Sequence, residues 1–168
     1  MAAGATYEPI ATQTLASAAT TITFSSIAAS WTDLRLIIVA KEASATYDFL
    51  QLQFNGDTST NYSYTDLYGT GSSASSGRVS NAAAITINRG SGLTATYGFY
   101  SADIFSYVGS TYKTILTTGS EDNNGSGGVT RTVGLWRSTS AITSLLIKTN
   151  GSDIAIGTTA TLYGIKAA

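Results

Sequence analysis

The chain has 168 residues, of which only 11% are charged, and its nine Lys and Arg residues nearly balance ten Asp and Glu residues. Globular proteins usually carry about 25% charged residues, so the expected surface is neutral, rich in hydroxyl groups and suited to dense packing against other subunits. The lack of a basic run argues against nucleic-acid binding, and the absence of Cys and His removes disulfides, thiol chemistry and the commonest general base.

The N-terminal residues 1–6 are small and featureless and are predicted to form an arm, with residues 7–168 as a single domain. No secretory signal is visible at the start, and no apolar segment reaches the ~18 residues that a membrane span requires. Tyr7–Leu15 is expected to be extended, and Pro9 restricts it to a sheet edge. Thr20–Phe24 alternates between polar and apolar residues, which predicts a half-buried strand.

Trp31–Lys41 is predicted to be the strand around which the others are arranged. Between Leu34 and Ala40 only Arg35 is polar, and the run is rich in β-branched residues. An apolar run of this length is typical of a strand, and its two apolar faces predict that both sides are covered.

The next segments contrast sharply in pattern. Phe49–Phe54 alternates as a strand does, and Asn55-Gly56 then predicts a tight turn, because both residues accept positive φ. No sustained period follows between Asp57 and Asn81, a span rich in Ser, Gly and Tyr. A long Ser/Gly/Tyr-rich loop is therefore expected there, and loops of this length are often functional.

The second half of the chain continues as strands separated by turns. Asn150-Gly151 predicts a hairpin between its flanking strands, and Gly119–Gly128 is expected to be a flexible loop. The spacing of about ten strands predicts an all-β fold, an antiparallel β-sandwich and specifically a jelly roll. The further predicted strands are Ala82–Asn88, Thr94–Val108, Tyr112–Thr118, Val129–Trp136, Ala141–Thr149, Asp153–Ile156 and Thr159–Lys166.

No catalytic, cofactor-binding or metal-binding residue is predicted. The carboxylates lie mostly at strand ends and in turns, where Asp caps backbone N–H groups, and no spacing supports a Ser–Lys pair. Glu121-Asp122-Asn123-Asn124 offers oxygen ligands that Ca²⁺ prefers, but it lacks the spaced ligands of an EF-hand loop. A solvated hairpin tip is the favoured interpretation, with calcium binding as the alternative.

Aromatic residues supply the candidate interface. Tyr62, Tyr64 and Tyr68 fall in the long polar loop, where they either form a recognition surface or fold back and become buried. Trp31 and Trp136 are expected to anchor the core or a subunit interface. The candidate interface residues are therefore Tyr7, Trp31, Tyr62, Tyr64, Tyr68 and Trp136.

Several short segments resemble virion proteins of tailed bacteriophages, such as those of aquatic and cyanobacterial hosts. They run in order over most of the chain, and each alone is of low complexity. The segments are Y-E-P-I-A-T-Q-T-L at Tyr7–Leu15, I-T-F-S-S-I at Ile22–Ile27, W-T-D-L-R-L at Trp31–Leu36, L-Q-F-N-G-D-T-S-T-N-Y-S at Leu52–Ser63, G-S-S-A-S-S at Gly71–Ser76 and L-Y-G-I-K at Leu162–Lys166.

The resemblance implies a structural β-sandwich protein and supplies no catalytic motif. It predicts a capsid decoration or cement protein on the virion exterior, assembled in the host cytoplasm, with the major capsid protein as partner and a homotrimer as the assembly. Neither nucleic acid nor membrane is an expected partner. The arm Met1–Ile10 and the loops at Asp57–Asn81 and Gly119–Gly128 are the expected contacts. The alternative is a tail, fibre or receptor-binding module that recognises host surface glycans.

Overall fold

A computed structural model describes residues 6–44, 48–90 and 92–166, and in these residues every regular element is a β-strand. No helix of this part of the chain has the length and apolarity to cross a membrane. The strands are β1 (Tyr7–Thr14), β2 (Thr21–Phe24), β3 (Asp33–Ala40), β4 (Gln51–Phe54), β5 (Tyr62–Gly69), β6 (Ala74–Ala82), β7 (Ile85–Thr86), β8 (Gly98–Ile104), β9 (Lys113–Glu121), β10 (Gly128–Trp136), β11 (Leu145–Lys148) and β12 (Thr159–Ile165).

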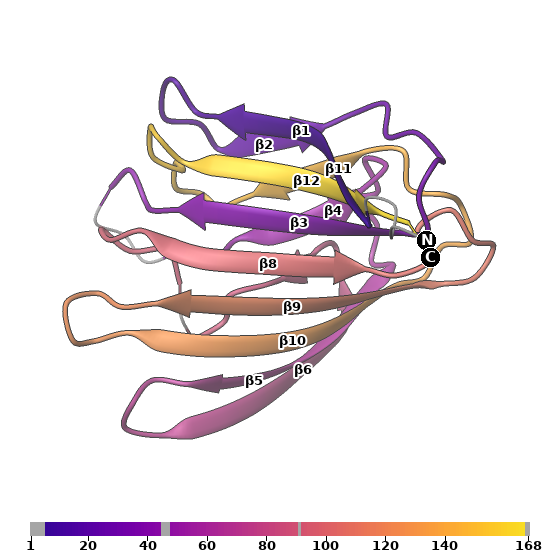
Figure 1. Cartoon of the computed structure of the whole chain (residues 1–168). Coiled ribbons are helices and arrows are strands. Elements are labelled where there is room, and N and C mark those ends of the chain that lie inside the picture. The colour runs from indigo at the N-terminus through magenta and orange to yellow at the C-terminus, as the bar shows by residue number, and fades with distance from the viewer. Residues whose placement is uncertain (1–5, 45–47, 91, 167–168) are drawn as a thin grey trace.

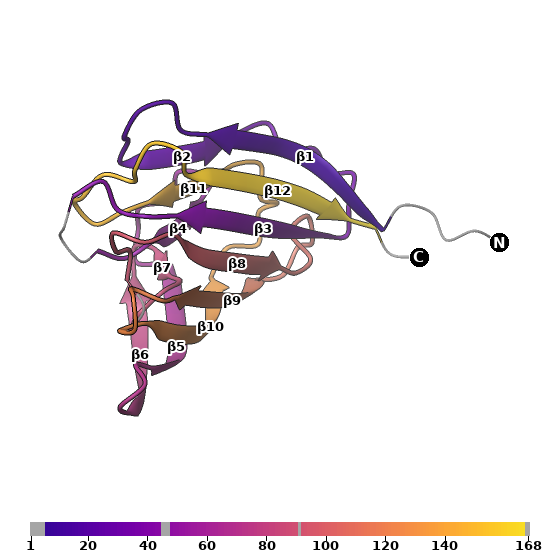
Figure 2. The same ribbon diagram turned by 60° about the vertical axis from the view of Figure 1, so that its left-hand side comes forward.

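The strands form two antiparallel sheets that pack face to face (Figure 1). One sheet has eight strands in the order β1-β12-β3-β8-β9-β10-β5-β6, and the other has four in the order β2-β11-β4-β7. The quartet β1-β12-β3-β8 against β2-β11-β4-β7 is the strand order of a jelly roll. The predicted all-β sandwich of jelly-roll type is thus confirmed. Two inserted hairpins, β5–β6 and β9–β10, lengthen one sheet, and we call β9-β10-β5-β6 the extension (Figure 2).

The predicted loop at Asp57–Asn81 is wrong, because most of it forms the β5–β6 hairpin. Its turn is closed by the Thr70 N–H, which donates to Ser73 O at 3.1 Å. Along β5 the inward positions hold Tyr and Asp, and the outward positions hold Ser63, Thr65 and Leu67. This alternation was present in the sequence, but the Ser and Gly content of β6 concealed the partner strand.

Within the chain itself β3 is covered on only one face, and cover of its other face by a neighbouring chain stays a prediction. Leu34, Leu36 and Ile38 are buried between the sheets, but Ile37 is only half-buried and Val39 is 38% exposed on the outer face. The strand is central to the sandwich nevertheless, because it pairs with β12 on one side and β8 on the other.

The core lies between the two sheets and follows the inward positions of each strand. An aromatic cluster closes one part of it, with the Phe54 and Trp136 ring centroids 5.6 Å apart and Tyr62 6.3 Å from both. Each large apolar side chain buried in this way contributes about 1.5–3 kcal/mol. The buried aliphatic core includes Ile22, Leu34, Leu36, Ile38, Leu50, Leu52, Ile85, Ile104, Ile115, Leu145, Ile147 and Leu162.

The segment that contains β7 supports the inner face of the extension. Ile85 packs so closely on β10 that a β-carbon at Gly134 would lie 2.7 Å from its side chain. The Thr117 hydroxyl donates to Ile87 O at 3.4 Å, and the Thr130 hydroxyl donates to Arg89 O. The two inserted hairpins are therefore fixed to the sandwich, and their other face remains open.

The predicted hairpin at Asn150-Gly151 does not form. β11 pairs with β2 and β4, and Ile154 makes only isolated bridges. The Asp48 carboxylate holds the turn instead, accepting the Asn150 N–H at 3.1 Å and the Ser152 N–H at 2.9 Å.

Candidate binding surface

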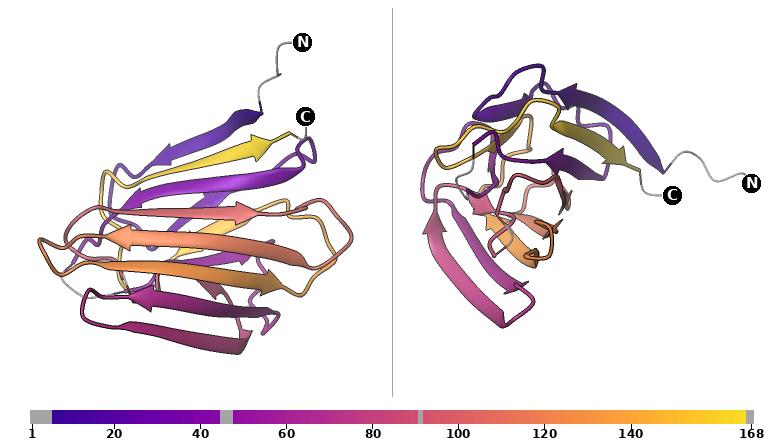
Figure 3. Two further views of the ribbon diagram at one scale, coloured as in Figure 1. Left: turned by 60° about the horizontal axis from the view of Figure 1, so that its bottom comes forward. Right: turned by 90° about the vertical axis from the view of Figure 1, so that its left-hand side faces the viewer.

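The outward side chains of the extension form one exposed surface, which we call the extension face. Register places Val133 between Leu116 of β9 and Thr65 of β5, and Arg131 beside Leu67. Val129, Leu67 and Val133 are 61%, 59% and 48% exposed, although they belong to strands whose inward positions are buried. Figure 3 shows this side of the eight-stranded sheet towards the viewer, with β5 and β6 at its lower end (left view). Large apolar side chains gathered on one face are typical of a binding surface.

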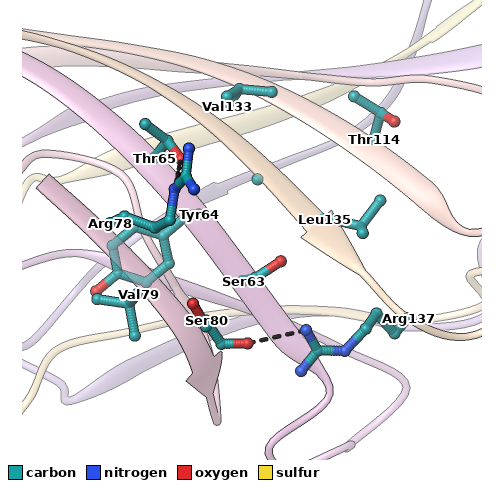
Figure 4. Close-up of a pocket in the computed structure, with 11 residues that line it drawn as sticks. Ser63, Tyr64, Thr65, Arg78, Val79, Ser80, Thr114, Val133, Leu135 and Arg137 are labelled. Carbon is teal, nitrogen blue, oxygen red and sulfur yellow. Dashed lines mark hydrogen bonds between the residues drawn. The ribbon is translucent and has the colours of Figure 1, made fainter.

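Two arginines flank a shallow groove of about 400 Å³ on this face. Arg78 comes from β6, and its Nε donates to the Thr65 hydroxyl at 3.2 Å. Arg137 follows β10, and its guanidinium donates to Ser80 O at 2.9 Å. Figure 4 shows the two guanidinium groups on either side of Ser63 and Ser80. The groove therefore combines hydroxyl groups with two positive charges.

A second groove of about 350 Å³ lies nearer the β5–β6 turn and is almost entirely apolar. Its walls include Leu67, Ala74 and Val129. The extension face thus has an apolar part beside a positively charged part, which is the arrangement that docking surfaces commonly use.

Positive charge on the extension face is not compensated by neighbouring carboxylates. Elsewhere in the described residues, Arg35 pairs with Asp103 at 3.4 Å and Lys166 pairs with Glu8 at 2.7 Å. Within the same part of the chain, no carboxylate lies within ion-pair distance of Arg78, Arg131 or Arg137. Summed charges of one sign attract oppositely charged partners, and this protein has few other charges to offset the effect.

The predicted interface tyrosines and tryptophans do not form one surface. Tyr62 is fully buried and Trp136 is 2% exposed, so both belong to the core, which removes them from the candidate interface. Tyr64 and Tyr68 are half-buried and point to the inner side of the extension, where the Tyr64 hydroxyl donates to Thr86 Oγ1 at 3.2 Å.

The remaining two predicted residues lie far from the extension in strand order. Tyr7 begins β1, the opposite edge of the eight-stranded sheet, and is 50% exposed. Trp31 is half-buried, and its Nε1 donates to Glu8 Oε2 at 3.0 Å. Both stay predicted contacts. Of the expected N-terminal arm, residues 1–5 lie outside the described residues.

Sequence reasoning missed the residues that define the extension face. The sequence pattern predicts a loop at Leu67 and Arg78, and Arg137 lies just beyond a predicted strand. The alternation of Tyr62, Tyr64, Asp66 and Tyr68 was the available signal, since it marks a strand whose intervening residues face outward.

The acidic segment Glu121–Asn124 is the tip of the β9–β10 hairpin. Asp122 Oδ1 accepts the Gly125 N–H at 2.7 Å, and Asn124 and Gly125 both have positive φ. Glu121 instead accepts the Thr94 hydroxyl at 2.9 Å, and burial raises the pKa of its carboxyl. Among the described residues, no three acidic side chains gather closely enough to hold a metal ion. The calcium alternative therefore gains no support from the geometry.

Comparison of the chain with protein-family models, with characterised proteins and with solved structures finds no match.

Proposed function

We propose that this protein is a virion structural protein of a tailed bacteriophage, and that it decorates the capsid by binding major capsid subunits through the extension face. The structural observation that supports binding through this face is the exposed apolar side chains beside uncompensated arginines on a protein with few charges. The bacteriophage-like segments at Tyr7–Leu15 and Leu52–Ser63 support the same assignment. A homotrimer that bridges neighbouring capsid subunits is the proposed assembly.

The proposed mechanism is mechanical. A rigid sandwich that packs across two capsid subunits stabilises their contact by about 25 cal/mol for each Å² of apolar surface removed from water. The bound protein therefore raises the free energy needed to separate the subunits when packaged genome presses on the shell. The jelly-roll core keeps the extension rigid, because Ile85 and Arg89 hold its inner face.

Capsids prepared without the protein provide the test. Adding back the wild-type chain should restore heat and osmotic resistance, whereas a Leu67→Ser, Val129→Ser double variant should attach less well and restore less. Ile156→Ser is the matched control, because Ile156 is 59% exposed but lies outside the extension. Equal attachment of all three chains would reject the extension face as the binding surface, and unchanged capsid stability without the protein would reject the cementing role.

A receptor-binding module is the second candidate, favoured by the groove in which Ser63 and Ser80 lie between two arginines. Hydroxyl and guanidinium groups are suitable donors for the oxygens of a surface glycan. Copy number in the virion separates the two proposals, since a decoration protein coats the shell and a tail module is present in few copies.

A further inference from the structure

β6 is a long sheet edge without the usual protection against pairing with another strand. At the opposite edge, β1 contains Pro9 and a register shift next to it, and in the smaller sheet the edge strands β2 and β7 have four and two residues. β6 has nine residues and no proline, and its register is regular from Ala74 to Val79, shifting only between Val79 and Ala82. Proteins normally block an edge of this kind with proline, lysine or a short strand.

Backbone groups along β6 face away from the sheet at alternate residues. The bond from Thr70 N–H to Ser73 O makes Gly69 and Ala74 a pair without mutual hydrogen bonds. Because such pairs alternate along an antiparallel ladder, the N–H and C=O groups of Ala74, Ser76 and Arg78 point to the open edge. The neighbouring side chains from Ala74 to Gly77 are small and leave room for another strand.

Two guanidinium groups lie on the extension face beside this edge. Arg78 is on β6 itself. Arg137 is held near the end of β6 by bonds to Ser80 O at 2.9 Å, Thr60 O at 2.6 Å and Asn81 Oδ1 at 3.1 Å. These bonds use three of the five guanidinium donors, so two donors and the positive charge remain for a partner. The carbonyl of Ser80 that Arg137 binds lies two residues beyond Arg78 along the same strand. Side chains two residues apart in an added strand lie on one face at about 6.6 Å.

We infer that β6 binds an extended acidic segment of a partner polypeptide as a ninth strand of the sheet. Main-chain hydrogen bonds to Ala74, Ser76 and Arg78 supply the pairing, and two carboxylates at positions i and i+2 of the segment meet Arg78 and Arg137. The regular spacing of free N–H and C=O groups favours a polypeptide over an anionic glycan. The inference rests on the proposed function only in taking the partner to be a protein.

Synthetic peptides of about ten residues test the inference on the full chain. One peptide carries Glu at i and i+2 within a Thr- and Val-rich strand sequence. A second has Gln at those positions, a third keeps both Glu but is N-methylated at alternate amides, and a uronic-acid oligosaccharide serves as a carbohydrate probe. Binding is measured by calorimetry, and amide hydrogen exchange reports on Ala74, Ser76 and Arg78.

The Glu peptide should bind and protect the three amides, and the Gln and N-methylated peptides should bind about tenfold more weakly or worse. Protection by the Glu peptide with loss on N-methylation supports strand addition. Strand addition is overturned if the Glu peptide does not bind. It is also overturned if the N-methylated peptide binds as tightly as the Glu peptide, or if the oligosaccharide does so without protecting the three amides.

Variants of the protein sharpen the test. Ser76→Pro removes an outward N–H without breaking a bond to β5, so it should abolish peptide binding while the fold is retained, and Ser76→Ala is its matched control. Arg78→Glu should weaken Glu-peptide binding, whereas Lys148→Gln, in the other sheet, should not. If Ser76→Pro remains folded and binds normally, strand addition is wrong. Capsid attachment measured separately keeps the proposed function testable whichever way the peptide result falls.

Discussion

The indole ring of Trp31 lies directly on Gly164 of β12, so closely that a β-carbon at position 164 would overlap it. The same indole donates from Nε1 to Glu8 of β1 at 3.0 Å, and Glu8 accepts Lys166 Nζ at 2.7 Å. One tryptophan therefore joins β1 to β12, the first and last strands of the described residues, and this contact requires glycine at one position.

Replacing Gly164 with Ala should destabilise the protein by about 1–3 kcal/mol, because the added methyl group forces the indole or the backbone to move. Denaturant unfolding measures the change. Gly69→Ala is the matched control, since its β-carbon would meet nothing closer than Ser73 O at 3.7 Å, and it should stay within about 0.5 kcal/mol of wild type. Equal stability of both variants would contradict the close contact.

The buried ion pair of the extension makes a second prediction. The Asp66 side chain is fully buried, and its compensating charge is Arg89 at 3.5 Å. Arg89→Met leaves a buried carboxylate without that charge and should cost about 2–4 kcal/mol, less than for a fully buried pair because Arg89 is 39% exposed. Arg35→Met, in the more exposed pair with Asp103, should cost about 0–1 kcal/mol. A difference in the reverse order would contradict this ranking.

The architecture was predictable from sequence where strand alternation was strong. Thr20–Phe24 follows the period of two, the stretch from Leu34 to Ala40 is an apolar run of strand length, and both form strands close to the predicted bounds. Asn55 has φ 53° and Gly56 has φ 67°, so the tight turn predicted there is also confirmed.

The binding surface was not predictable in the same way. Arg78 and Arg137 lie 59 positions apart in the sequence and come together only through the register of β6, β5 and β10. The hairpin predicted from Asn150-Gly151 does not form for a related reason. The Asp48 carboxylate accepts the N–H groups of the turn, and β11 pairs with β2 and β4. Local pattern reports the period of a strand, whereas pairing depends on long-range contacts.

Asp48 should make the protein sensitive to acid. Burial raises the pKa of its carboxyl, but hydrogen bonds from Ser152, Phe49 and Asn150 together outweigh burial and place the pKa below its ordinary value of 3.8. A depressed folded pKa stabilises the fold above the unfolded pKa, and this stability is lost as pH falls through the folded value.

Asp48→Asn tests that expectation. The variant should lose about 1–3 kcal/mol of unfolding free energy at pH 7, because several donors lose a charged acceptor. Its deficit relative to wild type should be smaller at pH 3, because this pH is below the ordinary pKa of 3.8 and the unfolded chain then takes up the proton. Unfolding curves at the two pH values give the comparison, and a deficit that does not change with pH would show that Asp48 does not act through its charge.

Tyr62 provides the corresponding prediction at high pH. Its hydroxyl accepts the Phe54 N–H at 3.0 Å and donates to Asp57 O at 3.1 Å, and burial, the main cause, raises its pKa to about 12. Because the phenol of Tyr62 has a higher pKa in the folded protein than in the unfolded chain, it stabilises the fold below the unfolded pKa of 10.0. This contribution is lost as the pH rises from 10.0 towards 12.

Tyr62→Phe should cost about 1–2 kcal/mol at neutral pH, because the buried Phe54 N–H loses its partner, and should flatten the alkaline loss of stability. The matched variant Tyr64→Phe removes a hydroxyl from the same strand that is bonded to the Thr86 side chain, and it serves as the control for the loss of one hydroxyl group. Ultraviolet titration of phenolate in wild type and in Tyr62→Phe, followed together with unfolding, isolates the contribution of Tyr62. A Tyr62 that ionises near pH 10 in the folded protein would contradict its place in the core.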